Sequence, residues 1–177
     1  MMDISRKIDP STINFRFTGK GVCFSDSNRI LDKLSKLDKG RFAVYRKGHP
    51  TLPMMPFVKN LKTGNIAKVT GTKNQYPYVS IGGVSVAMHR LVALCFIPNL
   101  EPDRKYIVDH RNITDGESGL PTNAHLCKLI LDKFNLRGTT VAATPWYCDW
   151  RAENLSWTTN GENKKNVQNK ELWTSIY

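Results

Sequence analysis

Hydrophobic residues between positions 88 and 96 recur at the spacing of one face of an α-helix. They stand at positions i, i+3, i+4, i+7 and i+8, and they are Met88, Leu91, Val92, Cys95 and Phe96. Pro98 follows, and proline does not continue a helix because it lacks a backbone N–H and clashes with the preceding turn. We therefore predict a core helix over residues 88–96.

Two further segments have helical character. Residues 26–39 carry isoleucine and leucine on one side, with Ser25 or Asp26 as the N-terminal cap and Gly40 as the stop. Asn160 is placed to cap a last helix that runs to about residue 170. The polar composition of this last helix predicts that most of its faces are exposed.

Short runs of β-branched and aromatic residues predict β-strands. Gly82 and Gly83 separate two of these runs and are typical of a two-residue hairpin turn. One further run comes directly before Asp109, and another begins at Asn154. The predicted strands cover residues 41–45, 57–58, 65–70, 76–81, 84–87, 106–108 and 154–157.

The basic residues are concentrated on the N-terminal side of the chain. Residues 1–105 carry the whole net charge of +11, and residues 106–177 are neutral overall. Such a surface favours a polyanionic partner, because lysine and arginine release counterions from phosphates. A solvated surface that only keeps the protein soluble is the alternative.

The chain is long enough for one medium domain with a core, since 40% of its 177 residues are hydrophobic. Residues 50–56 contain three prolines, which is typical of a linker or an extended arm. We place a basic, nucleic-acid-contacting region at residues 1–55 and the main domain at residues 56–177.

The cysteines Cys23, Cys95, Cys127 and Cys148 are far apart and form no Cys-x-x-Cys pair, which argues against a zinc ribbon and favours free thiols. Residues 1–10 lack the apolar core of a signal peptide, and no run has the length of a membrane span. We expect a cytoplasmic protein with no membrane partner.

Four polar residues suit the metal-assisted cleavage of a phosphodiester. His110 can take a proton from water near neutral pH, and the oxygens of Asp109 and Asn163 are ligands that suit one Mg²⁺ or Mn²⁺ ion. Asn154 would hold the loop that carries His110 through backbone hydrogen bonds. Neighbouring strand residues point to opposite faces, so Asp109 and His110 converge only if the strand ends or bends at the following turn.

Three motifs carry a resemblance to a known family, and they are MHRLVALCFIPN at residues 88–99, VDH at residues 108–110, and ENLSWTT followed by EN at residues 153–159 and 162–163. Together they resemble the HNH endonucleases of bacteriophages, especially homing endonucleases, over roughly residues 57–166. The resemblance implies His110 as general base, Asp109 and Asn163 as metal ligands, and Asn154 as the structural asparagine. It also implies products with a 3′-hydroxyl and a 5′-phosphate. Asn163 stands where the commoner family pattern has histidine, as in some homing nickases.

The chain departs from the family pattern in the spacing of the motif. His110 and Asn154 are separated by 43 residues, 111–153, where the family usually has a short loop. Thr122 or Asn123 can cap a helix within this insertion, and Gly138 can end it. We expect the inserted segment, at about residues 113–150, to fold as a unit of its own.

The remaining candidates concern DNA contact. We predict contacts from seven basic residues, which are Arg41, Arg46, Lys47, Lys68, Lys73, Arg90 and Arg111.

His89 is expected to be structural or close to a phosphate, and His49 and His125 to be surface residues. The cluster of Trp146, Tyr147 and Trp150 is expected to pack the insertion onto the core, with base stacking as the alternative.

These observations lead to an α+β fold with a ββα-metal (HNH, His-Me finger) core, preceded by a β-hairpin and a helix and interrupted by a helical insertion. The expected function is that of a divalent-metal-dependent endonuclease for double-stranded DNA, encoded by a phage or mobile element and acting in the host cytoplasm. One alternative is an inactive HNH scaffold that binds DNA or belongs to a virion; another, less supported, is an RNA-binding protein. Homing, host-DNA degradation and packaging all stay open, as does the choice between monomer and homodimer.

Overall fold

The computed structural model describes residues 5–7, 42–71, 76–81, 83–101, 104–105 and 107–163. It is a mixed α+β protein with short antiparallel sheets and few helices, which confirms the predicted class at this level. The predicted helix over residues 26–39 and the part of the last predicted helix beyond residue 163 lie outside the described residues.

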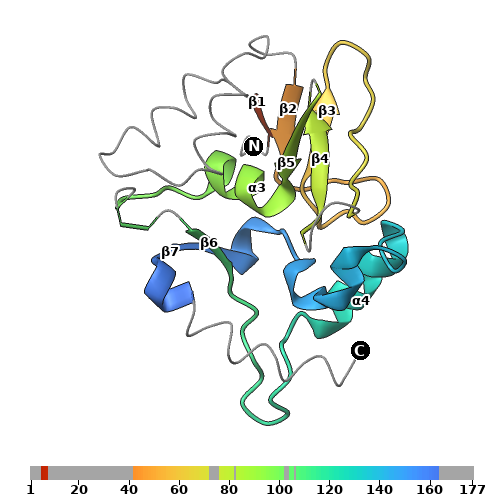
Figure 1. Ribbon diagram of the computed structural model, residues 1–177. Coiled ribbons are helices and arrows are strands. Elements are labelled where there is room, and N and C mark those ends of the chain that lie inside the picture. Colours follow the sequence, from red (N-terminus) through yellow and green to blue (C-terminus); the bar gives the residue numbers. More distant parts are fainter. Residues whose placement is uncertain are drawn as a thin grey trace.

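The first sheet joins β1 (Ser5–Lys7), β2 (Phe42–Tyr45) and β3 (Phe57–Asn60), each antiparallel to its neighbour (Figure 1). Val44 pairs with Val58, and both are fully buried. The loop between β2 and β3 holds the prolines, but it is not a linker: Leu52 and Met55 are buried in the core. The loop therefore packs onto the core through these apolar side chains, although its prolines are typical of an extended segment.

The second sheet is the hairpin of β4 (Tyr78–Ile81) and β5 (Val84–Ala87), with Ile81 paired to Val84 as the two glycines predicted. Gly83 has a φ of 82°, a conformation that side chains disfavour. The helix α3 (Met88–Phe96) follows directly and has the predicted bounds. The predicted strand over residues 65–70 is wrong, since this segment makes only the isolated bridges Lys59–Ile66 and Thr70–Tyr78.

The third sheet pairs β6 (Ile107–His110) with β7 (Leu155–Thr158) in antiparallel fashion. It lies below α3 in Figure 1, and the indole N–H of Trp157 donates to the carbonyl of Ile97 at 3.0 Å. Residues 160–163 are helical. Thr159, rather than the predicted Asn160, caps this turn, because Thr159 Oγ1 accepts from the Glu162 N–H and Glu162 Oε2 accepts from the Thr159 N–H.

The inserted segment contains α4 (Ala124–Lys133) and the 3₁₀ turns η1 (Thr140–Ala143), η2 (Pro145–Tyr147) and η3 (Ala152–Asn154). The helix α4 ends well before Gly138, because Asn135 adopts a left-handed conformation with φ 61°. Ile130, Leu136 and Trp150 belong to the same core cluster as α3 and β2. The expectation that the insertion folds as a separate unit is therefore wrong.

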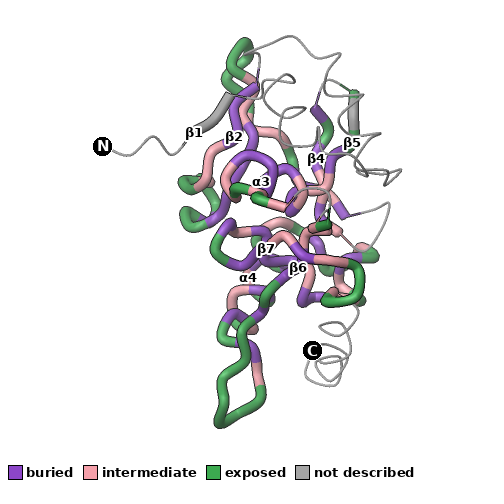
Figure 2. Tube along the Cα trace, turned by 90° about the vertical axis from the view of Figure 1, so that its left-hand side faces the viewer, coloured by how far each residue is buried: buried purple, intermediate pink, exposed green. Residues whose placement is uncertain are grey.

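A loop that we call the finger, residues 113–121, projects from the body of the protein (Figure 2). Residues 113–119 are exposed, and the base is closed by an isolated bridge between Thr114 and Pro121. No helix in the described ranges combines the length and apolar character that crossing a membrane requires.

Candidate active site

His110 is the last residue of β6, and the chain turns immediately after it. Asp109 pairs with Ser156 and His110 with Leu155, so both candidates lie within the strand. They are buried, with 4% and 1% of their surface exposed. Asn112 has a φ of 42°, so the chain bends two residues after His110.

Asn154 binds this turn from both sides, with the backbone hydrogen bonds that were expected from the sequence. Its side-chain oxygen accepts from the backbone N–H of Asn112 at 2.9 Å, and its backbone carbonyl accepts from the N–H of Arg111 at 2.7 Å. Its amide nitrogen donates to Asn112 Oδ1 at 3.1 Å and to the carbonyl of Asp149 at 2.9 Å. The left-handed conformation of Asn112 is thus held by buried hydrogen bonds to Asn154.

The inserted segment extends this network with residues that were not predicted from the sequence. Asn123 Nδ2 donates to Asn112 Oδ1 at 2.8 Å and to Asp149 Oδ2 at 2.7 Å. Arg151 completes the network with two bonds of 2.9 Å to the Asp149 carboxylate. The buried charge of Asp149 is therefore paired and hydrogen-bonded, as a buried carboxylate requires.

Four rings gather at the end of β6. The ring centroid of His110 lies 4.9 Å from that of His89, 5.3 Å from that of Tyr147 and 6.1 Å from that of Tyr76. Tyr76 in turn lies 4.6 Å from His89 and 4.7 Å from Tyr147. No sequence signal placed either tyrosine beside His110, because their meeting depends on how distant segments pack.

Burial shifts two ionisable groups of this cluster. It lowers the pKa of His89 well below the usual value, and the positive charges of His110 and Arg90 lower it further. Burial also raises the pKa of the Tyr76 hydroxyl, and Tyr147 adds to that rise through its charge and through a side-chain hydrogen bond. His89 and Tyr76 are therefore neutral near pH 7.

Asp109 and Asn163 are the predicted metal ligands. Asn163 lies in the helical turn after β7, where its backbone N–H donates to the Thr159 carbonyl at 3.0 Å. Over the described part of the chain, no three His, Cys, Asp or Glu side chains gather closely enough to hold a metal ion together. The two predicted ligands nevertheless fit Mg²⁺ chemically, since that ion takes oxygen ligands and keeps several waters when only one or two side chains bind it.

The predicted DNA contacts differ in exposure. Lys47, Lys68 and Arg111 are exposed, and Arg46 and Arg90 are half-buried. Arg41 and Lys73 lie outside the described residues. Within the aromatic cluster of the insertion, Trp146 and Trp150 are buried, which confirms packing rather than base stacking as their role.

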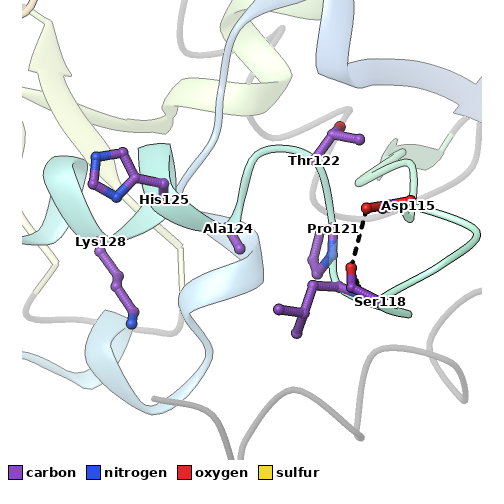
Figure 3. A pocket seen from close by; sticks show the side chains of 8 residues that line it. Asp115, Ser118, Pro121, Thr122, Ala124, His125 and Lys128 are labelled. Atoms are coloured by element: carbon purple, nitrogen blue, oxygen red, sulfur yellow. Dashed lines mark hydrogen bonds between the residues drawn. The ribbon is translucent and has the colours of Figure 1, made fainter.

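A pocket of about 580 Å³ opens between the finger and the start of α4 (Figure 3). Asp115 and Ser118 line it from the finger, and His125 and Lys128 line it from α4. A second pocket of about 400 Å³ includes His49, which is half-buried and tilted against Phe134 rather than a surface residue. None of the four predicted catalytic and metal-binding residues lines either pocket.

No protein-family model, curated protein or solved structure matches this chain.

Proposed function

We propose that the protein is a divalent-metal-dependent endonuclease that hydrolyses phosphodiester bonds in double-stranded DNA. The observation that carries the proposal is the pair of hydrogen bonds from Arg111 and Asn112 to Asn154. They fix the turn after His110 at the end of a two-stranded sheet, which a helical turn follows at residues 160–163. This order of strand, histidine, strand and helix is the order of the ββα-metal centre that the three sequence motifs resemble.

In the proposed mechanism, His110 removes a proton from the attacking water. Asp109 and Asn163 would hold one Mg²⁺ or Mn²⁺ ion, which supplies positive charge for the phosphate and the leaving oxygen. Asn154 does not contact the reacting atoms and acts by orienting the turn after His110. The basic residues of the N-terminal half, with Lys47 exposed among them, attract the phosphate backbone.

The test is a plasmid-nicking assay with and without Mg²⁺. We expect the wild-type protein to convert supercoiled plasmid to nicked or linear DNA, and His110→Ala to slow this by a factor on the order of 10² to 10⁴. DNA affinity should be retained in that variant. The matched control is His125→Ala, which removes an exposed histidine and should leave the rate unchanged.

The assay also separates the enzyme from an inactive DNA-binding or virion-associated scaffold. An inactive scaffold would bind DNA, but neither Mg²⁺ nor Mn²⁺ would produce nicks. Equal rates for wild type and His110→Ala would show that His110 is not the base.

A further inference from the structure

The inserted segment reaches the turn after His110 through its last part. Asn112 Nδ2 donates to the carbonyl of Trp146 at 2.8 Å, and Tyr147 is the next residue. Asp149 and Asn123 hold the same stretch to Asn112 and Asn154 through buried bonds of 2.7 to 2.9 Å. The residues on either side of Tyr147, Trp146 and Asp149, are thus hydrogen-bonded to the turn and its partners, and they hold Tyr147 beside the turn.

The ring of Tyr147 completes an enclosure of the His110 imidazole. His89 comes from α3, Tyr76 precedes β4, and Tyr147 lies in η2, so three distant segments each place one ring near His110. The rings of Tyr76 and Tyr147 also lie close to each other, with their centroids 4.7 Å apart. An imidazole packed among three rings cannot turn about its side-chain bonds without displacing a neighbour.

We propose that Tyr147 is a positioning residue for His110, and that Asn123 and Asp149 fix the segment that carries it. The inserted segment is then part of the active site and not an accessory to it. The inference rests on the proposed nuclease function, because positioning matters for catalysis only if His110 is the base. The ring, not the hydroxyl, does the positioning, since the ring lies against the imidazole.

The first test compares Tyr147→Ala with Tyr147→Phe in single-turnover cleavage at saturating DNA. A displaced catalytic group costs about 10²-fold in rate, so we expect Tyr147→Ala to lose about that factor while the DNA dissociation constant stays unchanged. Tyr147→Phe keeps the ring and should retain the wild-type rate. Asn123→Ala should slow cleavage in the same way as Tyr147→Ala, and His125→Ala is the control from the same segment.

The second test does not depend on activity. Diethylpyrocarbonate modifies accessible histidines, and mass spectrometry follows each site, with exposed His125 as the internal reference. We expect Tyr147→Ala to speed modification of His110 by a factor on the order of ten, because the local structure opens more often. Tyr147→Phe should leave the modification rate of His110 unchanged.

The results separate the two proposals. A wild-type protein that does not cleave DNA, with the expected modification pattern, would reject the nuclease but keep the positioning role of the ring. Unchanged modification of His110 in Tyr147→Ala would overturn the inference. So would a Tyr147→Phe variant as slow as Tyr147→Ala, since the hydroxyl would then be the acting group.

Discussion

His89 and His110 lie with their ring centroids 4.9 Å apart, one on α3 and the other at the end of β6. Two imidazolium ions at this distance in a buried site would repel each other strongly. Burial, together with the charges of His110 and Arg90, lowers the pKa of His89 well below its usual value. The folded protein therefore keeps His89 neutral at a pH where the unfolded chain protonates it.

The first prediction concerns stability as a function of pH. An unfolded histidine has a pKa of about 6.5, so below that pH the unfolded state binds a proton that folded His89 does not bind. Above about pH 6.5, the titration of His89 does not change the free energy of unfolding. As the pH is lowered below that value, the free energy of unfolding falls by up to about 1.4 kcal/mol per pH unit. Urea unfolding between pH 5 and 8 measures the slope. His89→Gln should flatten it, His125→Gln should not, and equal slopes in wild type and His89→Gln would contradict the prediction.

The second prediction concerns the proposed metal ligands. Under the proposed mechanism, Asp109→Ala and Asn163→Ala should each raise the Mg²⁺ concentration needed for half-maximal cleavage, because each would remove an oxygen ligand from a sparsely held ion. Asn160→Ala is the matched control, since it changes an exposed asparagine in the same helical turn. A metal titration that is the same for Asn163→Ala and Asn160→Ala would remove Asn163 from the ligand set.

The third prediction concerns Asn154. Replacing it with alanine leaves the Asn112 N–H and the Asp149 carbonyl without the buried partner that the side chain supplied. We expect a loss of about 1–3 kcal/mol in the free energy of unfolding, and slower cleavage with an unchanged Mg²⁺ requirement. Chemical denaturation and the metal titration check the two parts. A raised Mg²⁺ requirement would instead show that Asn154 acts near the ion.

The sequence predicted the local elements well because their signals are local. The apolar stripe and Pro98 define α3, and the two glycines define the hairpin of β4 and β5. The turn after His110 and its bonds to Asn154 were also expected, because polar residues stand at the ends of the two predicted strands there.

Other features depend on contacts between distant residues, which no local pattern encodes. Asn123 and Asp149 are 26 positions apart and meet only because the inserted segment folds onto the core. The same folding brings Tyr147 to His110 and buries Trp150. The left-handed conformation of Asn135 ends α4 three residues before Gly138, the residue that was predicted to end it. Asparagine is only a weak sequence signal for that conformation.

The fourth prediction concerns how firmly the insertion is joined to the core. Trp150 is fully buried, and its indole N–H donates to the carbonyl of Pro56 at 3.0 Å. Trp150→Ala should cost about 3–5 kcal/mol in the free energy of unfolding, and it should do so in one cooperative transition that includes the insertion. Leu100→Ala, at a position 92% exposed, should stay within about 0.5 kcal/mol of wild type. A separate early transition for the insertion would contradict its membership of the common core.

The fifth prediction concerns the charge asymmetry. Arg46→Gln combined with Lys47→Gln should reduce the slope of log affinity against log salt by up to about 2, at roughly 0.9 for each phosphate that is no longer neutralised. The control is Lys128→Gln combined with Lys133→Gln, which removes the same charge from α4. Filter binding to duplex DNA at several salt concentrations measures both. If only the α4 pair lowers the slope, the insertion and not the N-terminal half binds the phosphates.

The exposed finger offers a position for a fluorescent label that is close in sequence to His110. Its base is closed by the bridge between Thr114 and Pro121, and its tip is exposed, so a substitution such as Glu117→Cys changes no buried contact. Cys95, Cys127 and Cys148 are buried, and with Cys23 replaced by serine a thiol-reactive dye would attach selectively at position 117. The finger begins three residues after His110, so energy transfer from that dye to one on a DNA duplex would test the proposed function by reporting how close a bound duplex comes to the finger.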